Sequence, residues 1–350
     1  MLKHVTPEKV VNIVRLSVAM TFCWPLPVNS SKIKVIGYKI TQICATISIT
    51  LLFLPLLYSI YLRPDDIEIV STAVGQSICM VQSIIQTVIC FSKHDTLQRV
   101  IEELRTSIRE AKLHEREIFY TYLARCNVFY GSYIAEYPFD VNRTLVSVIV
   151  RAHQSIACCQ CCAHVCLSVF GALLIWFTAA RFECLAVEMQ RSTDIVTMSI
   201  CIGKQLRLKR YAEEVVSCFR LMVLFVITAC MFVMTLAATA IAMNTPLIVK
   251  VAFTGLSAAL LMYVYMYAWP ADYMKEKSLN VSRSVYDITW YEETVGMQKD
   301  LLNILVYQKP VTLSITCLVP ELSLGYFCTY LSNTLSFCTA LRAILDKNAT

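Results

Sequence analysis

The sequence predicts an all-α membrane protein with seven transmembrane helices, a cytoplasmic N-terminus, an extracellular C-terminus and a last helix split into two parts. The composition is the first reason. Of 350 residues, 57% are hydrophobic and 16% are charged, whereas about a quarter of the residues in soluble domains are charged. The second reason is an alternation of Lys-rich and Lys-poor segments along the chain. The third is a series of apolar runs near the roughly 20 residues that cross a bilayer.

The basic residues determine the predicted orientation. Twenty-one Lys and Arg residues fall in the first, third, fifth and seventh polar segments, counted from the N-terminus. The intervening segments hold five: Arg63, Arg143, Lys250, Arg342 and Lys347. Cytoplasmic loops retain Lys and Arg, so the odd segments are expected inside the cell. This topology places the sequon at Asn142 outside, where it is predicted to be glycosylated, and the sequon at Asn280 inside, where it is not.

The first three predicted spans come from the N-terminal half. Ile40–Tyr61 and Ile67–Phe91 are apolar over lengths that suit a bilayer. Between Ser92 and Glu117 charged residues alternate with apolar ones at three and four spacing, which predicts a cytoplasmic amphipathic extension of the second helix. Ile118–Ala135 is the third span, and it is barely long enough.

The next spans are longer or tightly connected. Leu145–Ala180 exceeds the bilayer thickness, so its lower end is expected to project into the cytoplasm, followed by a cytoplasmic segment from Arg181 to Glu214. Val215–Met243 and Leu247–Trp269 are the fifth and sixth spans, joined by a tight turn.

Two prolines divide the last apolar stretch. Pro310 and Pro320 forbid one uninterrupted helix, because proline lacks the backbone N–H and its ring clashes with the preceding turn. Pro320 suits a first helical position and Glu321 suits the positive end of a helix dipole. The terminal helix is therefore predicted to begin at Pro320 and to run to about Ile344.

Enzymatic and cofactor-binding motifs are absent from the sequence. No GxSxG, HExxH or phosphate-cradling loop occurs, and we expect no enzyme activity, no catalytic residue and no cofactor. The Cys158–Cys166 cluster with His164 has metal-like spacing. Consecutive cysteines on one helix point in different directions, however, so packing is predicted rather than a metal site. The net charge of +6 is spread over separate loops, which favours membrane lipids over nucleic acid as the partner.

Polar residues inside the predicted spans are costly unless they face a cavity or another helix. They are Gln76, Gln82, Gln86, Arg151, His153, Gln154 and Asn333. Most of them are expected to form hydrogen bonds between helices. For Arg151, His153 and Gln154, facing a cavity is an equally good explanation. On the final helix, small and polar residues recur at helical spacing, which indicates either tight packing or a water-filled path.

Several short motifs occur in order over most of the chain. They are Cys23-Trp24-Pro25, Tyr137–Asn142 leading into Ala152–Ile156, Ala180–Leu185, Tyr211–Glu214, Ala268–Asp272, Tyr286 with Trp290-Tyr291, Gln308–Pro310, and the ending from Ser323 to Arg342. In this order the chain resembles insect odorant receptors, of a hymenopteran type. The region between Glu117 and Tyr137 is shorter than in that family.

The resemblance implies an odorant-gated, non-selective cation channel subunit that assembles with the odorant coreceptor as a heterotetramer in the plasma membrane of olfactory neuron dendrites. Its ligand would be a small apolar volatile or cuticular compound. By this analogy the chain is one integral membrane domain over residues 1–350. Residues 1–180 hold spans one to four and the pocket side, and residues 181–350 hold spans five to seven with the cytoplasmic anchor and pore helix.

Site residues follow from the same resemblance. The implied ligand-binding residues are Ser71, Val74, Gly75, Ile78, Phe129, Tyr130, Tyr133, Ile149, His153, Ile156, Phe253 and Leu256. The implied pore-lining residues are Asn333, Ser336, Ala340, Ala343 and Ile344. Residues 181–214 and 271–309 would form the assembly surfaces.

Two other classes of membrane protein remain open. A gustatory-type or G-protein-coupled chemoreceptor would lack a pore of its own, and the latter would place its N-terminus outside. A secondary transporter would show internal repeats and paired broken helices, and only the seventh span is broken here.

Overall fold

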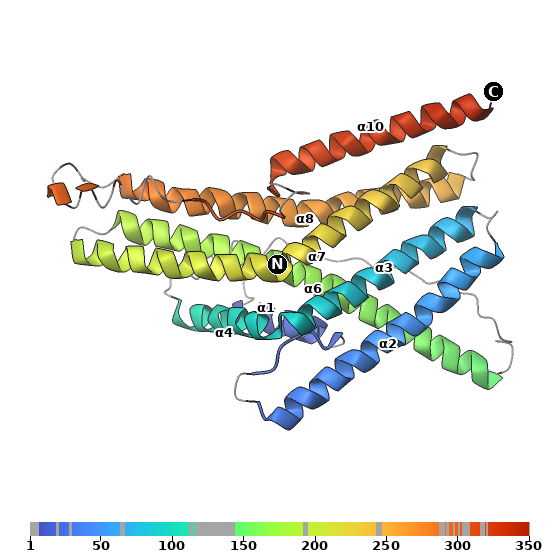
Figure 1. The fold of residues 1–350 in the computed structure, drawn as a ribbon, viewed down its shortest axis with the longest axis horizontal. Coiled ribbons are helices and arrows are strands. Elements are labelled where there is room, and N and C mark those ends of the chain that lie inside the picture. The colour runs from blue at the N-terminus through green and yellow to red at the C-terminus, as the bar shows by residue number, and fades with distance from the viewer. Residues whose placement is uncertain are drawn as a thin grey trace.

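The computed structural model is a helical bundle whose long helices run roughly along one axis (Figure 1). It describes residues 7–18, 21–27, 30–63, 67–111, 115, 144–191, 195–242, 247–286, 291, 294–296, 298–299, 302, 309–315, 319 and 321–349. The predicted third span and the sequon at Asn142 lie outside these residues.

The N-terminal half contains four helices. They are α1 (Pro7–Val18), α2 (Lys32–Leu62), α3 (Ile67–Ser92) and α4 (His94–Glu110). Helix α1 was not predicted, although Pro7 at its first position is a recognised start signal. The amphipathic stretch after α3 is a separate helix, α4, because the chain turns at Lys93. Its apolar stripe is buried as the spacing predicted, from Leu97 to Ile108.

The C-terminal half is built from three very long helices and a shorter one. They are α6 (Thr144–Gln190), α7 (Ile195–Ala242), α8 (Leu247–Tyr286) and α10 (Leu324–Ala349). The segment from Arg181 to Glu214, predicted as cytoplasmic with helical charge patterning, forms the end of α6 and the start of α7. Helix α8 likewise continues 17 residues past the predicted end at Trp269. The apolar runs therefore located these helices but underestimated their lengths, because charged residues with helical spacing extend each one.

The predicted start of the last helix is wrong. Helix α10 begins at Leu324 rather than at Pro320, and the Ser323 hydroxyl accepts the backbone N–H of Tyr326 at 3.2 Å, as an N-terminal cap does. Glu321 pairs with Lys275 of α8 instead of occupying the first turn. Before the helix, Ile315 and Val319 form an isolated antiparallel bridge.

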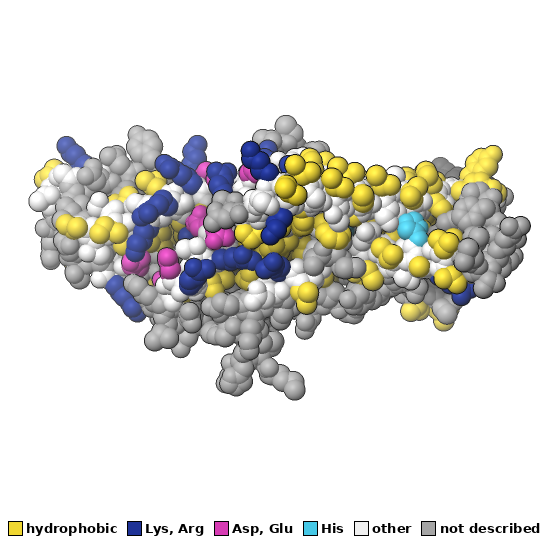
Figure 2. Space-filling model, turned by 90° about the horizontal axis from the view of Figure 1, so that it is seen from below, with side chains coloured by type: hydrophobic (Ala, Val, Ile, Leu, Met, Phe, Trp, Pro, Cys, Tyr) yellow, Lys and Arg dark blue, Asp and Glu magenta, His cyan; other side chains and the backbone are white. Residues whose placement is uncertain are grey.

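The surface of the bundle divides into two halves (Figure 2). One half gathers Lys, Arg, Asp and Glu; we call it the basic end, and it holds α4, Arg181–Gln190, the start of α7 and the last third of α8. The other half is covered by hydrophobic side chains, and we call it the apolar end. Within the described residues, four helical stretches are long and apolar enough to cross a membrane: Lys32–Leu62, Ala73–Ser92, Val148–Gln190 and Val196–Thr235.

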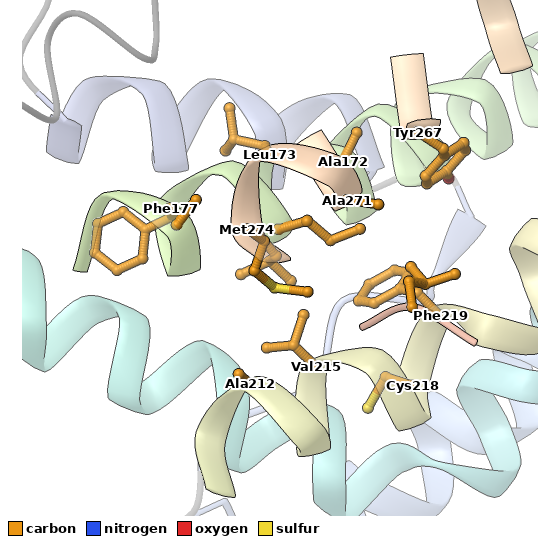
Figure 3. Close-up of a cluster of buried hydrophobic side chains, with 14 of the residues drawn as sticks. Ala172, Leu173, Phe177, Ala212, Val215, Cys218, Phe219, Tyr267, Ala271 and Met274 are labelled. Atoms are coloured by element: carbon orange, nitrogen blue, oxygen red, sulfur yellow. The ribbon is translucent and has the colours of Figure 1, made fainter. Parts of the chain in front are cut away.

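The core lies where α6, α7 and α8 meet (Figure 3). Small residues such as Ala172, Ala212 and Ala271 let the three helices approach closely, and Phe219 and Met274 fill the space between them. Gly171 is the tightest point. A Cβ on this glycine would stand 2.6 Å from the Phe219 ring, so α6 and α7 pack at this spacing because residue 171 has no side chain.

A short buried segment joins α1 to α2. Trp24 packs on Phe170 of α6 with ring centroids 5.0 Å apart, and its backbone carbonyl accepts the Tyr38 hydroxyl of α2. The Leu26 carbonyl accepts the side-chain amide of Gln98 on α4 at 2.6 Å. The segment therefore connects α2, α4 and α6 at the level where α3 ends.

Candidate functional site

Polar side chains line the contact of α3 with α6 and α8. Gln86 of α3 donates from Nε2 to the Ser168 hydroxyl of α6 at 2.8 Å, and Tyr267 of α8 donates to the Ser168 carbonyl at 2.7 Å. One turn along α3, Gln82 donates to the Tyr263 hydroxyl of α8 at 3.0 Å. Each bond joins two helices, so Gln82 and Gln86 serve helix packing, as expected for most of the intramembrane polar residues.

Buried His164 belongs to the same polar seam. Its Nδ1 lies 2.8 Å from the Gln160 carbonyl, which can only accept, so Nδ1 carries the proton. The Nε2 atom lies 2.9 Å from the Thr87 hydroxyl of α3. Sequence reasoning considered His164 as a metal ligand or a catalytic residue and did not predict this bond. Its spacing of four from Gln160 and Ser168 was the available signal, because these three residues share one face of α6.

The described cysteines pack as free thiols. Cys161 lies 3.8 Å from the Ser83 hydroxyl, within hydrogen-bonding reach of sulfur, and Cys184, Cys218 and Cys230 are buried in the core. Within the described part of the chain, no group of three His, Cys, Asp or Glu side chains is placed to hold a metal ion.

The predicted ligand-binding residues fall into three groups. Val74, Gly75 and Ile78 of α3 are half-buried, as are His153 of α6 and Phe253 of α8. Ile149, Ile156 and Leu256 are exposed. The side chain of Ser71 and all of Phe129, Tyr130 and Tyr133 lie outside the described residues.

His153 has a specific partner. Its Nε2 lies 3.0 Å from the Ser48 carbonyl of α2, and because a carbonyl only accepts, Nε2 is the donor. The imidazole therefore ties α6 to α2 at the apolar end. The half-buried predicted residues lie on α3, α6 and α8. They are nearer the apolar end than the hydrogen bond between Gln82 and Tyr263, which joins α3 to α8.

Helix α10 presents two different faces. Tyr330 and Thr334 are buried; the Thr334 hydroxyl lies 3.6 Å from the Met231 sulfur of α7, and Phe327 packs edge-on against Tyr265 of α8. The predicted pore residues Asn333, Ser336, Ala340 and Ala343 are exposed. The side chain of Ile344 lies outside the described residues. The polar stripe is therefore distinct from the face that packs on the bundle.

Ion pairs hold the basic end together. Arg181 of α6 meets Glu103 of α4 at 2.9 Å, and its guanidinium also covers the Tyr211 ring of α7 at 4.7 Å. Lys204 of α7 pairs with Glu188 of α6, and Lys277 of α8 lies 3.4 Å from Glu183 of α6. These contacts link four helices outside the apolar half.

The model of the 7tm Odorant receptor family matches residues 154–335, about half of the chain. The chain belongs to the odorant receptor family. It is therefore a multi-pass membrane receptor rather than a member of an enzyme family.

Solved structures show the same fold for this odorant receptor. The insect olfactory receptor OR5 from Machilis hrabei superposes with a TM-score of 0.76 at 12% sequence identity, over 95% of this chain and 97% of that one. The same receptor in complex with eugenol gives a TM-score of 0.77 at 11% identity, over 98% and 99% of the two chains. No curated protein sequence matches the chain.

Proposed function

We propose that this odorant receptor is a subunit of an odorant-gated, non-selective cation channel, assembled with the odorant coreceptor as a heterotetramer. The main observation that supports this proposal is the polar face of α10, which is exposed while the opposite side of the helix packs on α7 and α8. Exposed Asn333 and Ser336 are costly against lipid. A neighbouring subunit and a water-filled pore between subunits account for them.

The chain is proposed to cross the plasma membrane seven times with its N-terminus in the cytoplasm. The concentration of Lys and Arg at the basic end supports this orientation (Figure 2). Olfactory neuron dendrites are the proposed location. In this arrangement the basic end projects from the membrane as an extension of α6, α7 and α8.

The odorant is proposed to bind in the apolar end, among α3, α6, α8 and the third span. Half-buried Val74, Ile78 and Phe253 support this placement, since small-molecule sites are lined mostly by apolar side chains with a few polar groups. His153 supplies one such polar group. The eugenol complex of the Machilis hrabei receptor, which has the same fold, is consistent with a small volatile or cuticular compound.

Gating requires that the open arrangement bind the odorant better than the closed one. The helices that border the proposed site are also those on which α10 rests, because α8 contacts both α3 and α10. A shift of α8 on binding would therefore move the support of the pore helix. The proposed division of the chain follows: residues 1–180 supply most of the pocket, and residues 181–350 supply the anchor and pore.

Assembly is proposed to use residues 181–214 and 271–309 at the basic end. Val196, Ile200 and Leu206 of α7 expose large hydrophobic side chains there, as do Val295 and Leu302. Outside the bilayer these side chains would face water, and apolar patches of this kind mark protein contacts. Neighbouring subunits are the proposed cover.

Expression with the coreceptor tests the proposal. The expected result is a cation current evoked by at least one odorant of a broad panel. This current should be absent when the receptor subunit is omitted. Surface labelling of the complex serves as the control. A complex that reaches the surface and conducts no current with any odorant would overturn the channel function, and an extracellular N-terminal epitope would overturn the orientation.

A further inference from the structure

One face of α2 remains uncovered by the bundle from the N-terminal end of the helix onward. Ile33, Ile36, Ile40 and Ile43 expose 83%, 59%, 55% and 52% of their surfaces. Their spacing of three and four residues places them in one stripe along the helix. Lys32 and Lys39 border the same stripe, seven residues or about two turns apart.

Helix α3 extends this surface. The Lys39 ammonium lies 5.0 Å from the centroid of the Phe91 ring, and Phe91 and Val88 of α3 are exposed beside it. The apolar stripe and its basic border therefore span two helices.

The positive charge beside the isoleucine stripe of α2 comes from lysine. Burial lowers the pKa of His94 at the start of α4, and Lys39 acts in the same direction while Asp95 opposes it. The imidazole is therefore neutral near pH 7. Helix α2 contains no Asp or Glu from Lys32 to Leu62, so no acidic residue on this helix neutralises Lys32 or Lys39.

The exposed apolar face continues along α2 beyond Ile43, through Ile47, Leu51, Leu54 and Leu57. The two lysines lie at its N-terminal end. Lys32 and Lys39 are separated by about 10 Å along the helix axis. A headgroup with more than one phosphate can therefore meet both ammonium groups while its acyl chains follow the isoleucines.

We propose that Lys32, Lys39 and the isoleucine stripe of α2 form a binding site for an anionic phospholipid. The phosphates lie between the two lysines, and the acyl chains run along Ile36, Ile40 and Ile43. The assignment to the cytoplasmic leaflet rests on the orientation proposed above. Bound lipid would steady the start of α2, which the hydrogen bond from Tyr38 to Trp24 connects to the segment packed on α6.

Native mass spectrometry of the purified full-length chain in detergent tests the site. Phosphatidylinositol 4,5-bisphosphate and phosphatidylcholine are offered in turn. The wild-type chain is expected to retain the bisphosphate lipid in preference to phosphatidylcholine. The K32Q/K39Q variant loses two lysines that each favour an anionic surface, so it is expected to bind the anionic lipid about 30-fold more weakly.

A matched variant controls for net charge. Arg207 and Arg210 of α7 are exposed at the basic end, away from α2, and R207Q/R210Q also removes two positive charges. This variant is expected to retain the anionic lipid as the wild type does, and size-exclusion profiles confirm that both variants are folded. Equal losses in the two variants, or equal retention of both lipids, would refute the site.

The contribution of the acyl chains has a separate readout. Soluble inositol trisphosphate carries the headgroup charges without chains, and it is expected to compete poorly. Full competition would refute the role of the isoleucine stripe. None of these measurements requires an odorant or the coreceptor, so their outcome is independent of the proposed channel function.

Discussion

Alanine at Gly171 tests the close approach of α6 and α7. The new Cβ would lie 2.6 Å from Cδ1 and 2.8 Å from Cε1 of Phe219, about 1 Å inside an ordinary carbon–carbon contact. The Phe219 ring is fully buried among α6, α7 and α8 (Figure 3). Overpacking of a core costs about 1 to 3 kcal/mol, and the better helix propensity of alanine returns up to about 1 kcal/mol. We expect a net loss of about 1 to 2 kcal/mol.

Thermal unfolding of the purified receptor, followed by fluorescence-detected size exclusion, measures this loss. G203A is the matched control, because Gly203 also lies inside a long helix and its added Cβ meets nothing within 4 Å. G203A is expected to be as stable as the wild type or slightly more stable. In the F219L background, G171A should cost less than in the wild type, since a smaller side chain relieves the contact. A G171A receptor that unfolds at or above the temperature of G203A would refute the packing.

Further variants test the polar seam, the topology and the pore. Q86L removes the bond to Ser168, and because interhelical bonds in membranes average about 0.6 kcal/mol, it should lower thermal stability by about that amount; a loss above about 3 kcal/mol would contradict a packing role. N142Q should reduce a glycan-dependent gel shift whereas N280Q should not, and the reverse pattern would invert the proposed topology. S336L should reduce the unitary cation conductance of the assembled channel without changing the odorant concentration for half-maximal current; unchanged conductance would remove Ser336 from the pore.

Local sequence signals predicted the helices but not how far they extend. The starts of α3 at Ile67 and α8 at Leu247 were predicted because a loop or tight turn precedes an apolar run at each place. The ends of α6 and α8 were missed because hydropathy falls at the membrane boundary while helical hydrogen bonding continues. For α10, Pro320 predicts the start of the helix because proline favours a first helical position. The Ser323 cap and the pairing of Glu321 with Lys275 instead define the start at Leu324.

The candidate site shows the limit of sequence reasoning more clearly. Intramembrane polarity identified Gln82 and Gln86, because an amide inside a span needs a partner. The partners Tyr263 and Ser168 could not be predicted, since each comes from another helix at a register that only packing determines. The sequence shows the spacing of His164 from its neighbouring cysteines on α6, but not its partner on another helix. Its contact with Thr87 depends on how α3 crosses α6.

The unbroken length of α6 and α7 has a mechanical consequence. The two helices contain 47 and 48 residues and no proline, so each is a rod of about 70 Å. Tilting such a rod by roughly 5° about one end displaces the other end by about 6 Å. An adjustment that is small beside a bound odorant therefore becomes a displacement of several ångströms at the opposite tip, where the neighbouring subunits of the proposed channel would meet.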